Sequence, residues 1–125
     1  MMFEAGQRWA YAAPSEVADS RILIGAVVTF EGGRRIACCA VTASLERADD
    51  GSIEVVSVPF LPLTFEALGE TVTVQDGVAE PPDDFADHLA AWQSDPRGAR
   101  YFTVPFEGSL ERMIARQMAA IVEQP

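Results

Sequence analysis

Alternating and continuous apolar stretches in the first sixty residues predict β-strands. A Gly32-Gly33 pair separates two of these stretches, and glycine readily adopts the positive φ angles of a tight hairpin turn. Residues 49–51, Asp-Asp-Gly, mark a second turn, so an antiparallel meander is expected. The predicted strands of this half cover residues 6–12, 22–30, 36–44 and 53–58.

Proline and capping residues punctuate the middle of the chain. We expect Pro59 and Pro62 to end strand pairing, because proline has no backbone N–H to donate. Thr64 is the predicted N-cap of a short helix that ends near Gly69. Two further strands are predicted, over residues 71–75 and 100–104.

Two longer helices are predicted from apolar residues spaced three and four apart. Phe85, Leu89 and Trp92 share one face of the first, which we expect to pack on the sheet. Ser109 is the predicted N-cap of the second helix. Its apolar stripe consists of Leu110, Met113, Ile114, Met118, Ile121 and Val122. The first expectation is that this stripe packs on the chain's own sheet, and the alternative is that it meets a partner.

Strands followed by helices predict an α+β fold. We expect a bent, mostly antiparallel sheet, covered on one side by two longer helices and one short helix. A small, partly open barrel is the nearest variant. The length of 125 residues suits one domain, and no repeat or linker interrupts the chain, so residues 1–125 are predicted to form a single domain.

Charge narrows the range of partners. Nine basic residues, all of them Arg, oppose nineteen acidic residues, which gives a net charge of -10. This acidic chain repels phosphate backbones, so we expect no nucleic-acid partner. The lack of Lys also excludes Schiff-base and phosphate-loop chemistry.

The cysteines and the start of the chain bear on location. Cys38 and Cys39 are neighbours in a predicted strand, where successive side chains point to opposite faces, so two reduced thiols are expected. Residues 1–9 contain no apolar signal segment, and no apolar run approaches the roughly 20 residues of a membrane helix. The sequence therefore predicts a cytoplasmic protein with no membrane partner.

Residue types that commonly catalyse reactions do not form a recognisable catalytic or metal-binding pattern in this sequence. His88 is the only histidine, and the nearby Asp84 and Asp87 do not complete a known metal-ligand spacing. The adjacent Cys38 and Cys39 match neither a redox motif nor a zinc motif. We therefore predict no catalytic residue, no metal site and no cofactor, and we do not expect an enzyme.

Two groups of residues are candidate binding sites. Aromatic side chains and one arginine would line the concave face of the sheet: Trp9, Tyr11, Arg100 and Tyr101. For Trp9 and Tyr11, core packing is the competing interpretation. Carboxylates would form an acidic partner-binding surface: Asp76, Glu80, Asp83, Asp84 and Asp87. Ordinary solvated charges in a loop and at a helix N-terminus are the alternative for this second group.

Basic residues gather near the end of the chain. The group consists of Arg97, Arg100, Arg112 and Arg116. Such a group either grips a carboxylate or phosphate, or balances the neighbouring Glu107 and Glu111. Both interpretations remain open from the sequence.

Short aromatic and glycine-rich motifs are spread over most of the chain. They are Phe3, the opening Gly6-Gln7-x-Trp9-x-Tyr11, the middle Leu61-Pro62 and Ala67-Leu68, and residues 101–105 before a helix. Together they resemble a group of small uncharacterised bacterial proteins of about this length. The resemblance implies a shared fold and supplies no activity. The chain departs from the group in the third strand, where Ala37 and Cys38 stand in place of a histidine that follows the isoleucine.

Small size, acidic charge and the lack of a catalytic set predict a non-enzymatic interaction or regulatory module. Acidic immunity proteins that mask basic nucleases have a similar composition. The alternative is a small-molecule-binding protein, or a modest enzyme, with its site in the concave face of the sheet. A concave pocket with converging polar groups would favour this alternative, whereas a filled core would favour the module. The expected partner is another protein or a second copy of the chain.

Overall fold

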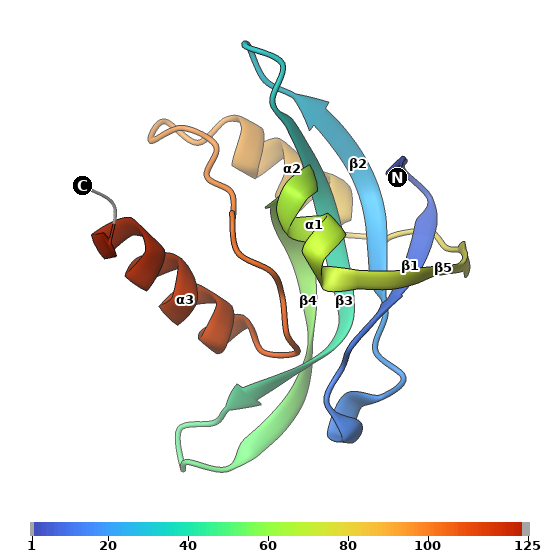
Figure 1. Cartoon of the computed structure of the whole chain (residues 1–125), viewed down its shortest axis with the longest axis vertical. Coiled ribbons are helices and arrows are strands. Elements are labelled where there is room, and N and C mark those ends of the chain that lie inside the picture. The colour runs from blue at the N-terminus through green and yellow to red at the C-terminus, as the bar shows by residue number, and fades with distance from the viewer. Residues whose placement is uncertain (1, 124–125) are drawn as a thin grey trace.

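A computed structural model describes residues 2–123 and has an α+β fold around one open antiparallel sheet (Figure 1). The strands are β1 (Gln7–Tyr11), β2 (Ile22–Thr29), β3 (Arg35–Arg47), β4 (Ile53–Thr64) and β5 (Val72–Val78). The helices are α1 (Phe65–Thr71), α2 (Phe85–Gln93) and α3 (Leu110–Glu123), with a short 3-10 turn at Ser15–Val17. The strand order is β4-β3-β2-β1-β5, so β4 and β5 are the two edges and the sheet does not close into a barrel.

The predicted hairpin joins β2 to β3. Gly32 and Gly33 have φ angles of 93° and 89°, and the Phe30 amide donates to the Arg34 carbonyl at 2.7 Å. Thr64 also acts as predicted, because its side-chain oxygen accepts a hydrogen bond from the Ala67 amide at the start of α1. Both features depend on residues a few positions apart, which local sequence patterns describe well.

The expectation that prolines end strand pairing is wrong. β4 continues to Thr64, and Pro62 lies opposite Cys38 in β3. β4 is an edge strand, and the Pro62 carbonyl points away from β3 and accepts from the Phe102 amide at 3.0 Å. The Pro62 nitrogen is therefore also directed outward, where no ladder hydrogen bond to β3 is lost.

The strand predicted over residues 100–104 is reduced to a single bridge between Phe102 and Leu63. A longer parallel ladder would need an N–H at position 62 to donate to the Arg100 carbonyl, and proline has none. That carbonyl instead accepts a hydrogen bond from Nε1 of Trp92. Pro62 thus ends this pairing on the side of Arg100, although it does not stop β4 itself.

Helices cover both faces of the sheet, and not one face as expected. Ala37, Cys39 and Val41 of β3 point into the larger core, which includes α1 and Met113 of α3. The alternate residues Ile36 and Cys38 point into a smaller core, closed by Phe85 of α2. Figure 1 shows α1 in front of the sheet and α2 behind it. The cause is that residues 36–41 are apolar at every position, so both faces of β3 need a cover.

The two cysteines are free thiols with 0% exposure. Burial raises the pKa of Cys38 to about 12 and raises the pKa of Cys39 as well, to which the neighbouring Cys38 contributes. The thiolate is the reactive form of cysteine, so both side chains are inert core residues at neutral pH.

We expect the free energy of unfolding to fall as the pH rises above about 9. Unfolded thiols lose their protons near pH 8.5, whereas the buried thiols hold theirs to higher pH, so the unfolded state gains stability first. The loss is on the order of 1 kcal/mol per pH unit for each thiol. Urea unfolding at pH 8, 9 and 10 measures it. A variant with Cys38→Ala and Cys39→Ala should show a shallower dependence, and an equal slope would contradict the assignment.

Candidate functional site

The apolar stripe of α3 does not pack on the sheet along its length, contrary to expectation. Met113 is buried, with 1% exposure, and Leu110 is half-buried. Four larger side chains are exposed: Ile114 (46%), Met118 (60%), Ile121 (58%) and Val122 (80%). The neighbouring Ala115 and Ala119 are exposed too. We call this outward surface the α3 face: Ile114, Ala115, Met118, Ala119, Ile121 and Val122.

Residues 99–105 explain why the stripe is exposed. This segment runs between α3 and β4 (Figure 1). The Thr103 amide donates to Oε1 of Gln117 at 2.7 Å, and Nε2 of Gln117 donates back to Oγ1 of Thr103 at 3.1 Å. The side of α3 that would otherwise reach the sheet is therefore occupied by the chain itself.

The N-terminus of α3 is fixed by a carboxylate from β3. Oε1 of Glu46 accepts from the Leu110 amide at 2.6 Å, and Oε2 accepts from the Glu111 amide at 3.3 Å. Ser44 donates its hydroxyl to the same Glu46 carboxylate at 2.6 Å. A negative charge at this end of a helix also interacts favourably with the helix dipole. The predicted cap Ser109 contributes as well, since its Oγ accepts from the Arg112 amide.

A groove of about 560 Å³ lies between α3 and residues 99–102. Its lining consists of Ala99, Arg100, Tyr101, Phe102, Ile114, Gln117, Met118 and Ile121. Most of this lining is apolar, and the polar groups of Gln117 are already bonded to Thr103. Arg100 is exposed and makes no ion pair with the side chains of residues 2–122. The groove and the α3 face are continuous, because they share Ile114, Met118 and Ile121.

Burying the exposed apolar side chains of α3 against a partner would release free energy. Fully burying an Ile, Met or Val side chain stabilises a protein by roughly 1.5–3 kcal/mol. Single exposed apolar residues are common on protein surfaces, but a contiguous apolar surface marks a place of contact. The α3 face is therefore the feature of this molecule that most strongly indicates a binding surface.

Trp9 and Tyr11 lie in the core, which agrees with the competing interpretation of these residues. They are 6% and 7% exposed, and the rings of Phe3 and Phe106 pack on them at centroid distances of 5.3 and 5.5 Å. Tyr11 donates its hydroxyl to Oγ of Ser20 at 2.8 Å. Burial raises the pKa of Tyr11, although the Ser20 hydrogen bond and then the charge of Arg21 oppose the rise.

The predicted ligand site on the concave face of the sheet is not formed. Arg100 and Tyr101 line the groove beside α3, whereas Trp9 and Tyr11 belong to the larger core. The four residues therefore do not surround a common cavity. The reason is that Phe3 packs on Trp9 and Phe106 packs on Tyr11, which places both side chains in the core.

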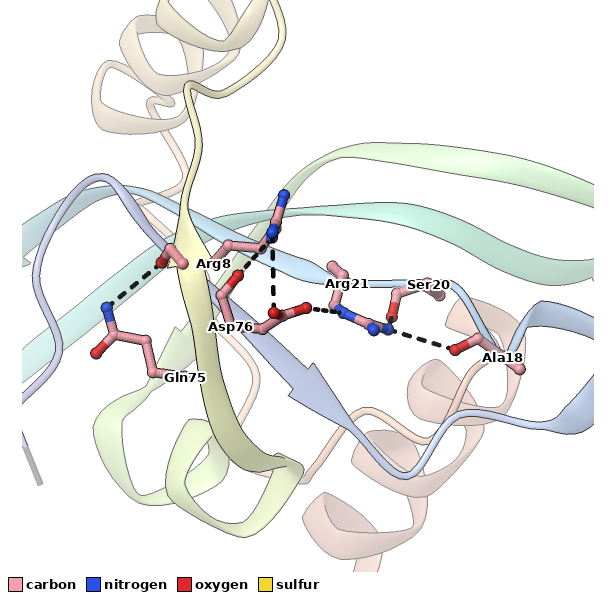
Figure 2. A network of polar contacts seen from close by, with 7 residues as sticks. Arg8, Ala18, Ser20, Arg21, Gln75 and Asp76 are labelled. Carbon is pink, nitrogen blue, oxygen red and sulfur yellow. Dashed lines mark hydrogen bonds and ion pairs between the residues drawn. The ribbon is translucent and has the colours of Figure 1, made fainter.

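The five carboxylates of the predicted acidic surface lie between residues 76 and 87, which we call the acidic segment. Its first member, Asp76, is held in ion pairs (Figure 2). Nε of Arg21 donates to Oδ2 of Asp76 at 2.7 Å. Arg8 lies 3.8 Å from the other carboxylate oxygen and donates through Nε to the Asp76 carbonyl. The Arg21 hydrogen bond is the main cause that lowers the pKa of Asp76, and Arg8 adds to it. Asp76 therefore fastens β5 to the start of β2 and is not a free acidic charge.

The other members of the acidic segment lie near α2. Asp84 pairs with His88 at 3.2 Å, and His88 stacks on the ring of Phe60. His88 is thus a surface residue of α2 with a local partner. The remaining carboxylates are exposed and stay candidates for a partner-binding surface: Glu80, Asp83 and Asp87.

Two of the basic residues near the end of the chain form separate ion pairs with neighbouring carboxylates. Arg116 forms an ion pair with Glu107, and Arg97 pairs with Asp95 at 3.2 Å. The Arg97 hydrogen bonds are the largest cause that lowers the pKa of Asp95. These contacts favour charge balance over a common anion site for this group.

The side chains of residues 2–122 include no group of three His, Cys, Asp or Glu placed to hold a metal ion. Within the same range, no helix has the length and apolarity that crossing a membrane requires. Comparisons with protein-family models, with curated proteins and with solved structures find no match to this chain, so its resemblance to small bacterial proteins stays a prediction.

Proposed function

We propose that the protein is a non-enzymatic interaction module, which binds another protein chain through the α3 face. The observation that carries the proposal is the exposure of Ile114, Met118, Ile121 and Val122, at 46–80%, on three consecutive turns of one helix. Apolar contact surfaces of this kind recur where a helix meets a partner. The net charge of -10 disfavours nucleic acid as that partner.

Other surfaces support the proposal less well. Exposed apolar side chains also occur in pairs on the edge strands, at Ile53 and Val55 of β4 and at Val74 and Val78 of β5. These pairs do not adjoin the groove. The acidic segment has Asp76 in ion pairs, which reduces the charge that it offers to a partner. We propose that the module is cytoplasmic, because its two buried cysteines are free thiols, as is usual in a reducing compartment.

A small-molecule-binding protein is the second candidate. The groove of about 560 Å³ has the volume of common ligand pockets, and Arg100 and Tyr101 belong to its lining. Ligand pockets usually combine an apolar lining with several converging polar groups. Here Gln117 is bonded to Thr103, so the groove offers little beyond Arg100 for specificity. A protein partner is therefore the better-supported proposal.

A photo-crosslinking amino acid at Met118 tests the proposal. Val74 provides the matched control, because both residues are 60% exposed and Val74 lies on a different element. In cells that express the protein, we expect discrete adducts with a protein chain from position 118 and not from position 74. Electrophoresis and mass spectrometry identify the adducts.

Two results would contradict the proposal. One is a lack of protein adducts at position 118, and the other is the same adducts from both positions. A stoichiometric small molecule in native mass spectra, lost in a Met118→Asp variant that keeps its melting temperature, would favour the second candidate instead.

A further inference from the structure

We infer that the partner of the α3 face is a second copy of this chain, with the two α3 helices antiparallel and related by a twofold axis near Met118. This inference rests on the proposed function and names its partner. A twofold interface needs one surface that is complementary to itself. The α3 face meets this requirement in the placement of its side chains and in its charge, and its area suits a weak dimer.

Two large exposed side chains lie at equal distances along α3 from Met118. Ile114 and Val122 are exposed four positions before and after Met118. An antiparallel pair centred there brings Ile114 of one copy against Val122 of the other, twice. It also brings Ala115 against Ile121 of the other copy, and a small residue opposite a large one lets two helices approach closely.

The charges complement each other only in the antiparallel arrangement. Residues 99–105 run in the opposite direction to α3 (Figure 1), and Thr103 is bonded to Gln117. Arg100 therefore lies toward the C-terminal half of α3, where it shares the groove with Ile121. Glu111 is exposed in the first turn of α3, where its Oε1 accepts a hydrogen bond from the Arg47 amide at 3.1 Å. In an antiparallel pair, Glu111 of each copy approaches Arg100 of the other, whereas a parallel pair would place like charges together.

The α3 face also avoids the repulsion that a net charge of -10 imposes on two copies. No acidic residue lies between Ile114 and Val122 in the sequence. The one basic residue in that interval, Arg116, is paired with Glu107 of its own chain. Two strongly acidic molecules can therefore meet here without bringing carboxylates together at the centre.

The available area fits a weak dimer. An Ile, Met or Val side chain offers on the order of 100 Å² of apolar surface, and the four large ones are about half to four-fifths exposed. They supply roughly 250 Å² from each copy, to which the alanines and the groove rim add. The two copies together supply roughly 500 Å² from these side chains, and the alanines and groove rim raise the total toward about 1,000 Å², the lower end of specific interfaces. We expect a reversible dimer with a dissociation constant on the order of 10–100 μM.

Charge reversal provides the first test. Variants Arg100→Glu and Glu111→Arg should each dimerise at least tenfold more weakly than the wild type, as measured by sedimentation equilibrium. An equimolar mixture of the two should regain dimers, because one inter-copy pair is then the native Glu111–Arg100 pair and the other joins the two substituted positions with their signs exchanged. A mixture that stays as dissociated as either variant alone overturns the inference, and so does a wild-type protein that is monomeric at about 1 mM, well above the expected constant.

Engineered cysteines provide a second test that does not depend on charge. Under mild oxidation, Ile114→Cys mixed with Val122→Cys should form disulfide heterodimers, whereas each variant alone should form few. Cys38 and Cys39 do not interfere, because both are buried. Val74→Cys is the exposed control and should form no specific dimer. Homodimers from each single variant, with no excess of heterodimer, would indicate a different arrangement and overturn the inference.

The failure of this inference is distinguishable from that of the proposed function. Photo-adducts at Met118 that contain only a different protein would keep the interaction module and overturn self-association. Adducts of the chain with itself would support both.

Discussion

Met113→Asp should unfold the protein or lower its free energy of unfolding by about 4 kcal/mol or more, since it places an unpaired charge in the core. Met113 is 1% exposed and packs among the residues of the larger core. Ile114→Asp, one position further, should leave the melting temperature almost unchanged, because Ile114 is 46% exposed on the α3 face. Thermal and urea unfolding, followed by far-UV circular dichroism, measures both.

A conservative control separates the added charge from a change of volume. Met113→Leu keeps a similar apolar volume and should cost less than about 1.5 kcal/mol. Equal destabilisation by the two aspartate substitutions would contradict the exposure of the α3 face. Light scattering on the folded Ile114→Asp variant should at the same time report the loss of the inferred dimer.

Gly25→Ala should destabilise the protein by about 1–3 kcal/mol, as overpacking a filled core does. Gly25 lies in β2 at a register shift between Ile24 and Ala26. A Cβ atom there would overlap Cε1 and Cζ of the Phe85 ring. Phe85 is 4% exposed, so its ring has little room to move, and α2 would have to shift away from the sheet. Urea unfolding measures the change.

Gly69→Ala is the matched control for this substitution. Gly69 lies within α1, has no positive φ, and has no atom within 4 Å of the added Cβ position. Alanine there should therefore raise stability by up to about 1 kcal/mol through its helix propensity. The opposite signs of the two glycine substitutions are the expected result. A neutral Gly25→Ala would show that α2 packs more loosely on β2 than described above.

Local features of this fold were predictable from the sequence, because their physical cause lies within a few residues. The glycine pair of the hairpin and the capping side chains of Thr64 and Ser109 belong to this group. Interactions between distant residues were not predictable. Glu46 caps a helix 64 residues further along the chain, and no local pattern at Glu46 indicates this role.

The candidate site was predictable in part. The periodicity of α3 predicts an apolar stripe correctly, but the same periodicity results whether the stripe packs on its own sheet or on a partner. The segment that separates α3 from the sheet decides between the two, and its position depends on the Gln117–Thr103 hydrogen bonds. Aromatic residues such as Trp9 and Tyr11 likewise have the same pattern in a core as in a pocket.

Pro62 has a consequence for the state of the protein in concentrated solution. The outer edge of a long strand such as β4 is normally a template on which further chains can add without limit, as in a fibril. Here one outward donor is absent at Pro62, and Phe102 already occupies the Pro62 carbonyl and the Thr64 amide. This stretch of the edge is thus closed to a foreign strand. Strand addition is thereby blocked along residues 62–64 of β4, while the α3 face stays open to a partner.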